Sequence, residues 1–230
     1  MADRHGPLPP LLHSLTVVTG LVDAVSYLAL GHVFVANMTG NVIFLGLSAF
    51  GAPGISAVTS LTSIAAFLAA GVAGGRMVRA HKHRGRLLAH CAAAELVLVG
   101  ACALVAAWSG GEAARLALIV LLALAMGLQN TVVRALAVPD LLTTVLTMTL
   151  TGLAADSTLA GGAGTNTRRR IAAVGAMLVG ALIGAVLTLR ASVIAALIAA
   201  ALLLAATWAV AQRLSQVDRD ASWAAMNAPR

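Results

Sequence analysis

Residues 12–50 read LHSLTVVTGLVDAVSYLALGHVFVANMTGNVIFLGLSAF. They contain two apolar runs, and polar residues interrupt the second one. The first run, residues 12–31, is about twenty residues long, which is the length that an α-helix needs to cross a bilayer. The second run, residues 34–50, carries two asparagines, a threonine and a glycine within its ANMTGN stretch. These residues predict one membrane-spanning helix followed by a short, interrupted apolar segment.

The composition of the whole chain agrees with a membrane location. Of its 230 residues, 60% are hydrophobic and 10% are charged, whereas soluble globular domains are about 45–50% apolar and about 25% charged. A water-soluble domain is therefore excluded, and so is an intrinsically disordered chain, which needs low hydrophobicity and high charge. We expect an all-α polytopic integral membrane protein.

Eight apolar segments follow one another along the chain, and two of them are too short to span. Residues 34–50 and 141–155 would reach only about 25 and 22 Å as helices, short of a hydrocarbon core of about 30 Å. We expect about six transmembrane helices plus two broken or re-entrant segments. The predicted segments are residues 12–31, 34–50, 55–75, 87–108, 116–137, 141–155, 171–189 and 192–211.

The distribution of Lys and Arg distinguishes two topologies. If all eight segments cross, seven of the 15 cations lie on the side of the loop between residues 76 and 86 and eight lie opposite, which is no bias. If the short segments return to the side they came from, 13 lie inside and only Arg115 and Arg190 lie outside. The positive-inside rule favours the second topology, with both termini cytoplasmic in a bacterial inner membrane.

The two halves of the chain show a faint internal repeat. GLVDAV from Gly20 aligns with GLQNTV from Gly127, which places Asp23 opposite Asn130. With one inserted residue, MTGN aligns with LTMT and pairs Thr39 with Thr147. In the six-helix topology the halves would be inverted repeats. We expect a cytoplasmic N-terminus (1–11), one transmembrane domain (12–211, with repeats at 12–108 and 114–211) and a cytoplasmic C-terminal tail (212–230).

Residues 22–46, VDAVSYLALGHVFVANMTGNVIFLG, and residues 122–156, LALAMGLQNTVVRALAVPDLLTTVLTMTLTGLAAD, resemble the YoaK-like family of bacterial membrane proteins. The resemblance spans nearly the whole chain. It implies a small multi-spanning protein of the cell envelope with no assigned substrate or activity. The sequence departs from the family at Met148, where the resemblance implies a small residue, usually glycine. The close backbone approach that Gly40 permits in the first half is then expected to be looser in the second.

Asp23 is the first candidate for function, because it lies about 16 Å into its predicted helix. A carboxylate at that depth is costly unless it faces protein or water. It either couples a proton or cation or is satisfied by Ser26, Tyr27 or a neighbouring helix. Glu95, about two turns into its helix, is a second candidate ion-coupling group.

The ANMTGN stretch is the second candidate, since broken backbone at membrane depth is tolerated only where it is buried or lines a cavity. A half-helix that begins near Asn37 or Thr39 would aim its N–H groups into the protein, ready for an anionic or polar ligand. The alternative is a kink packed through Gly40. The predicted substrate-binding residues are Asn37, Thr39, Gly40, Asn41, Asn130, Thr147 and Thr149; Pro139 and Asp140 are interpreted as ordinary helix capping.

These features favour a secondary transporter or permease for a small polar solute, coupled through Asp23. A non-transporting envelope or assembly protein, a passive channel and a membrane-embedded enzyme are the alternatives. An enzyme is not expected, because no nucleophile with a base and no cofactor motif is present. No cofactor, metal site or nucleic-acid partner is expected: His81, His83 and His90 lack partnering cysteines or carboxylates. The bilayer is the predicted partner, and a homo-oligomer is left open.

Overall fold

The computed structural model describes residues 5–138, 146–162, 164, 166–217 and 223–226. The described residues form α-helices, one 3-10 turn and one isolated β-bridge, between His83 and Ala225, but no strand. The helices are α1 (Leu8–Ala29), α2 (Met38–Ser48), α3 (Ala57–Ala80), α4 (Arg84–Trp108), α5 (Glu112–Leu136), α6 (Leu146–Ala155), α7 (Thr167–Arg190) and α8 (Val193–Val217), with the turn η1 (Thr158–Ala160) after α6. The start of the predicted segment 141–155, with Pro139 and Asp140, lies outside the described residues.

Among the residues that the structure describes, six helices are long and apolar enough to cross a membrane, and α2 and α6 are not. The predicted class, a polytopic helical membrane protein, is confirmed. Several helices extend beyond the predicted apolar segments: α3 continues through Arg76 and Arg79 to Ala80, and α4 begins at Arg84. A helix keeps its hydrogen bonds as it leaves the hydrocarbon core, so polar flanks do not end it.

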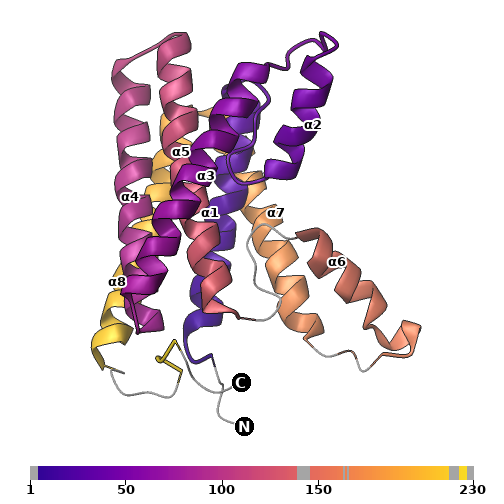
Figure 1. The fold of residues 1–230 in the computed structure, drawn as a ribbon, viewed down its shortest axis with the longest axis vertical. Helices are drawn as coiled ribbons and strands as arrows, with labels where there is room; N and C mark the ends of the chain where they lie inside the picture. The colour runs from indigo at the N-terminus through magenta and orange to yellow at the C-terminus, as the bar shows by residue number, and fades with distance from the viewer. Residues whose placement is uncertain (1–4, 139–145, 163, 165, 218–222, 227–230) are drawn as a thin grey trace.

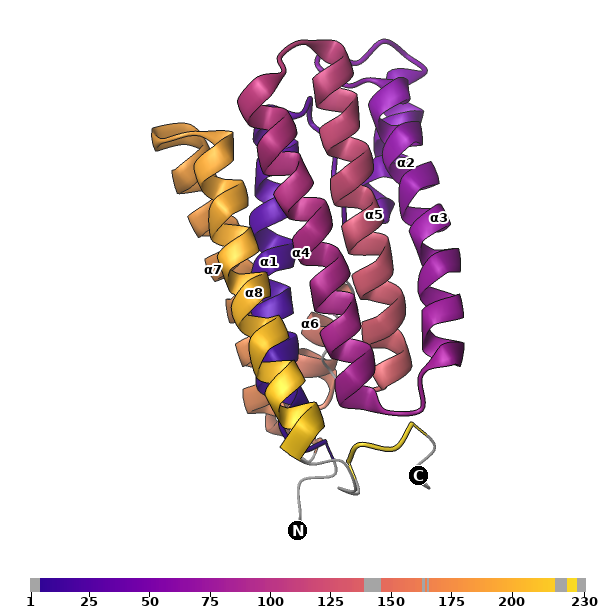
Figure 2. The same ribbon diagram turned by 90° about the vertical axis from the view of Figure 1, so that its left-hand side faces the viewer.

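The long helices form one bundle in which each half of the chain packs against the other (Figures 1 and 2). Helix α1 lies along α7 and α8, while α5 lies along α3 and α4, and α4 also packs against α8. Short helix α2 packs on α3, and α6 packs on α7. Exposed leucines and valines such as Leu68, Val97 and Leu202 cover the outside of the bundle, where lipid replaces water as their neighbour.

Glycines in both halves of the chain allow close helix contacts. A β-carbon on Gly20 of α1 would collide with the carbonyl oxygen of Met177 in α7, and one on Gly127 of α5 would collide with the carbonyl oxygen of Phe67 in α3. Small residues at such contacts let helix backbones approach each other in a membrane, where packing rather than the hydrophobic effect drives association.

The chain between α1 and α3 enters the bundle and returns to the same end. Helix α1 ends where Gly31 and His32 take positive φ angles of 92° and 53°. An extended stretch then runs back into the protein, and α2 rises from Met38 towards the end of the bundle where α1 stopped and α3 begins (Figure 1). The short segment is therefore re-entrant, as its length predicted.

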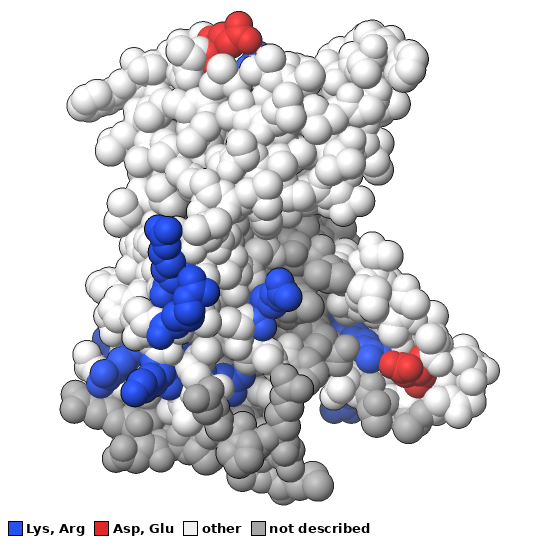
Figure 3. Space-filling view, in the orientation of Figure 1, with Lys and Arg blue, Asp and Glu red and all other residues white. Residues whose placement is uncertain are grey.

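Basic side chains gather at one end of the bundle, the end where α1 begins and α8 finishes (Figure 3). The α3–α4 turn lies at this end, and described residues 223–226 dock against it. The backbone N–H of Arg84 donates to Ala224 (2.8 Å) and that of Met226 to Lys82 (3.0 Å). Buried Arg84 also donates to the carbonyl oxygens of Trp223 and Leu136. The part of the tail that is described is thus attached to the bundle.

Candidate functional site

The carboxylate of Asp23 binds the backbone of residues 33–37, the non-helical stretch before α2 that we call the break. Asp23 is 5% exposed, and its Oδ1 accepts hydrogen bonds from the N–H groups of Val35 (3.0 Å) and Ala36 (2.9 Å). The backbone of Asn37, the next residue, also hydrogen-bonds this carboxylate. These groups lie directly before the N-terminus of α2, where unpaired N–H groups and the helix dipole favour a negative charge. The sequence predicted that an anionic or polar ligand would bind these N–H groups. In the structure the carboxylate of Asp23 binds them instead.

Asn41 fixes the backbone of Phe34 from the other side. Its Oδ1 accepts from Phe34 N–H (2.9 Å) and its Nδ2 donates to the Phe34 carbonyl (2.7 Å), which also accepts from Ser63 Oγ (2.7 Å). Asn41 is fully buried. Its amide therefore satisfies the backbone that the break leaves unpaired, which is the usual requirement for irregular chain at membrane depth.

Aromatic rings stack on the break, and sequence reasoning did not find them. The ring of Phe34 stacks on those of Tyr27 and Phe44, with centroids 5.4 and 5.7 Å apart. A β-carbon on Gly40 would lie 2.6 Å from the Phe34 ring, so Gly40 leaves the space that this ring fills. The sequence did contain a signal for them: Tyr27, Phe34 and Phe44 lie close together in a chain that is only 3% aromatic.

A cavity of about 650 Å³ is lined by α1, α6 and α7 and by Phe34 and Asn37, which precede α2. It brings together three of the predicted site residues, Asp23, Asn37 and Thr147, which come from both halves of the chain. The remaining lining is glycine, alanine, leucine and methionine with the rings of Tyr27 and Phe34: Gly20, Ala24, Tyr27, Leu28, Phe34, Leu146, Leu150, Met177, Leu178, Ala181, Leu182 and Ala185.

The other predicted site residues do not line this cavity. Thr39 is exposed, while Gly40 and Asn41 support Phe34 as described above. Thr149 is buried in α6. The family resemblance implied a small residue, usually glycine, at Met148. The Met148 side chain is 68% exposed, so this position lacks the close packing found at Gly40.

Asn130 and Glu95 lie in other parts of the bundle. Asn130 Nδ2 donates to the Met126 carbonyl one turn earlier (2.9 Å), on α5. Glu95 is fully buried on α4, where its Oε1 accepts from Cys91 Sγ at 3.0 Å. Since α4 and α5 pack against each other and contribute no residue to the cavity, neither side chain shares a site with Asp23.

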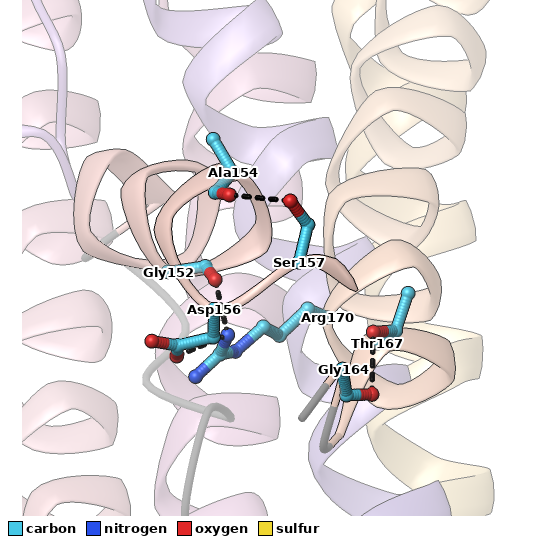
Figure 4. Close-up of polar contacts among 7 residues, drawn as sticks. All are labelled: Gly152, Ala154, Asp156, Ser157, Gly164, Thr167 and Arg170. Carbon is cyan, nitrogen blue, oxygen red and sulfur yellow. Dashed lines mark hydrogen bonds and ion pairs between the residues drawn. The ribbon is translucent and has the colours of Figure 1, made fainter. Parts of the chain in front are cut away.

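The end of α6 is attached to the start of α7 by Arg170, as Figure 4 shows. The guanidinium of Arg170 donates to the carbonyl oxygen of Gly152 and forms an ion pair with Asp156 at 2.7 Å. Ser157 Oγ donates to Ala154 O (2.7 Å), which closes the turn after α6. A cation at a helix C-terminus is favourable. In the sequence analysis, Arg170 counted only as one of the cations that indicate topology. In the structure it holds α6, the second short helix, against the start of α7.

Within the described residues there is no group of three or more His, Cys, Asp and Glu side chains placed to hold a metal ion. Among the described residues that line the cavity, the polar side chains are those of backbone-bound Asp23 and of Tyr27, Asn37 and Thr147. They can orient a polar solute by hydrogen bonds, and Asp23 can exchange a proton.

A membrane protein with a bundle of six long helices, two short helices and a cavity that both halves of the chain line is the class of protein that the fold and site define. The chain belongs to the family described as "Protein of unknown function (DUF1275)", whose family model matches residues 11–210. It is 32% identical over 148 residues to the UPF0700 transmembrane protein YoaK of Bacillus subtilis (strain 168). That match covers 64% of this chain and 65% of the relative. No solved structure is significantly similar to the chain. The YoaK-like resemblance is thus confirmed.

Proposed function

We propose that this protein is a secondary transporter for a small polar solute, which binds in the cavity beside the break. The observation that carries the proposal is that Asp23, Asn37 and Thr147, from both halves of the chain, line one cavity of about 650 Å³. Cavities of about 300–1,000 Å³ with a few convergent polar groups are typical of small-molecule sites. Because most of the lining is apolar, the solute that fits best has a polar group on a small apolar body.

Asp23 links proton binding to the shape of the cavity. As a carboxylate it attracts the N–H groups of Val35 and Ala36, and a proton on it removes the charge that strengthens those bonds. The residues on either side of this pair, Phe34 and Asn37, line the cavity. Protonation therefore loosens a wall of the cavity, which is the coupling that the proposal assigns to Asp23.

Matched glycine contacts support an inverted-repeat arrangement. Gly20 packs against the carbonyl oxygen of Met177, and Gly127 packs in the same way against the carbonyl oxygen of Phe67. Seven residues further along α7 and α3, Gly184 packs on Ala24 and Gly74 packs on Thr131, and the alignment of Gly20 with Gly127 also pairs Ala24 with Thr131. Transporters built from inverted repeats bind solute near the bilayer midplane at discontinuous helices. We place α2 and α6 in that role.

The charged side chains support a location in a bacterial inner membrane with the basic end in the cytoplasm. Among described residues, Arg115 and Arg190 lie at the start of α5 and the end of α7, away from the end where the other Lys and Arg gather. Cytoplasmic loops carry such an excess of cations. An enzymatic role is not part of the proposal.

The test is solute flux in sealed proteoliposomes, with a panel of radiolabelled amino acids, organic amines and sugars, each assayed with and without an imposed pH gradient. We expect uptake of at least one class that depends on the gradient in the wild type and becomes independent of it in Asp23→Asn. A passive channel would give uptake that no pH gradient alters in either protein. No uptake of any class would contradict a transport function.

A further inference from the structure

The corner between α3 and α4 carries exposed cations that the proposed transport site does not use. We name this surface the α3–α4 corner and define it by its exposed residues Arg76, Arg79, Lys82 and Arg86, together with the imidazoles of His81 and His90. The first two cations lie in the last turns of α3 and the fourth in the first turn of α4. Four cations within eleven residues at the end of two membrane helices form a strongly basic surface (Figure 3).

The two histidines join the helices at this corner. His81 Nδ1 lies 2.8 Å from the carbonyl oxygen of Met77, so that nitrogen donates its hydrogen there. His81 Nε2 lies 3.0 Å from His90 Nδ1, which links the end of α3 to the second turn of α4. The contact between His81 and His90 therefore joins the two helices that carry the arginines of the corner.

No acidic side chain among the described residues neutralises the corner. The ion pairs that join described residues are Glu112 with Arg115 and Asp156 with Arg170, at the starts of α5 and α7. A metal cation would be repelled by the surrounding arginines, whereas an anion would be attracted. The chemistry that the corner favours is therefore a phosphate group, which the guanidinium fork can bind through two hydrogen bonds.

The direction of the α3 arginines places this chemistry at the membrane surface. Helical side chains point back towards the N-terminus of their helix, and α3 ends at this corner. In agreement, the Arg79 guanidinium lies beside Gly75, one turn back along the apolar helix. Its charge thus lies closer to the bilayer than its own backbone does, where lipid phosphates are found, rather than extending into the aqueous phase.

We propose that the α3–α4 corner is a binding site for the phosphate headgroup of an anionic phospholipid, independent of the transport cavity. Arg76 and Arg79 reach the phosphate from the bilayer side, and Lys82 and Arg86 approach it from the aqueous side. Basic pockets at the cytoplasmic ends of membrane helices are suited to anionic lipid headgroups.

The experiment is native mass spectrometry of the delipidated full-length protein titrated with phosphatidylglycerol, phosphatidylcholine or inorganic phosphate. The test variant is Arg79→Gln/Lys82→Gln/Arg86→Gln. The matched control is Arg168→Gln/Arg190→Gln/Arg213→Gln, which removes the same charge from exposed positions outside the corner. We expect the test variant to lose about a hundredfold in phosphatidylglycerol affinity, because each cation near an anionic surface contributes about a factor of five. The control should stay within a few-fold of the wild type.

Three results would overturn the proposal. The test variant could bind phosphatidylglycerol as the wild type does, or the control could lose as much affinity, which would reduce the effect to net charge. Alternatively, inorganic phosphate could bind the wild type as tightly as the lipid, which would make this a free-anion site. Thermal melting in phosphatidylcholine checks that each variant is folded. If the triple variant unfolds, Arg79→Gln alone must show about a fivefold loss.

Discussion

At the scale of single residues, polar side chains at the break have two different tasks. Asn41 is buried and bonded to the backbone of Phe34, whereas Asn37 is exposed to the cavity and its side chain makes no capping hydrogen bond. Sequence alone gave these asparagines the same role, because they lie four residues apart in one polar stretch. Which of them faces protein depends on how α2 packs on α3, and that is a tertiary property.

This difference predicts opposite effects of two alanine substitutions. Asn41→Ala leaves buried backbone groups of Phe34 with fewer partners, which costs about 1–3 kcal/mol for an unsatisfied group. It should lower the melting temperature in detergent and the folded yield. Asn37→Ala should leave both unchanged and reduce solute uptake in proteoliposomes. If both substitutions lower the yield equally and neither changes uptake selectively, the polar break serves only helix packing, as an assembly protein would require.

At the scale of elements, the length and polarity of the apolar segments were enough to predict six long apolar helices and two short broken or re-entrant segments. The cavity was only partly predictable. The repeat alignment grouped Asp23 with Asn130, but α1 packs along α7 and α5 packs along α3, so the two aligned positions lie at separate interfaces. The stacked rings of Tyr27, Phe34 and Phe44 were missed because aromatic contacts across a broken segment leave no periodic signal.

Close packing of α7 on α1 gives a prediction with a control on the same helix. A β-carbon on Gly180 would collide with the carbonyl oxygen of Val17, whereas one on Gly175 has open space around it. Gly180→Leu should push the helices apart and cost more than the 1–3 kcal/mol typical of overpacking, because backbone rather than a side chain is struck. Gly175→Leu should be tolerated. The yield of monodisperse protein on size-exclusion chromatography measures both, and equal yields would contradict the contact.

The turn after α6 gives a second prediction at this scale. Arg170→Gln removes the ion pair with Asp156 and weakens the attachment of α6 to α7. Asp156 is half-exposed, so the pair itself contributes little and the loss is felt mainly at the Gly152 carbonyl. We expect faster local hydrogen exchange in residues 146–160 and unchanged exchange in α4. Uniform exchange changes across the bundle would show that Arg170 stabilises the whole fold instead.

At the scale of the whole molecule, the six-helix topology requires that both short segments return to the side they came from. Cysteines introduced at Gly110 and at highly exposed Leu159 lie at opposite ends of the bundle. With the basic end in the cytoplasm, a membrane-impermeant maleimide should label the Gly110 position in intact cells and the Leu159 position only after permeabilisation. The native cysteines, Cys91 and Cys102, are buried and should not react. Labelling of the Leu159 position from outside would exclude this topology.

The central claim is that the cavity beside Asp23 binds a solute in a way that depends on a proton at Asp23. The most direct test is a thermal-stability screen of the detergent-purified protein against amino acids, organic amines, sugars and small ions, at one acidic and one alkaline pH. Ligands that bind the folded state raise the melting temperature. We predict that at least one compound stabilises the wild type to an extent that changes with pH, and stabilises Asp23→Asn to the same extent at both pH values. If no compound stabilises either protein, while Asp23→Asn alone alters the melting temperature, Asp23 only holds the broken backbone and the claim is contradicted.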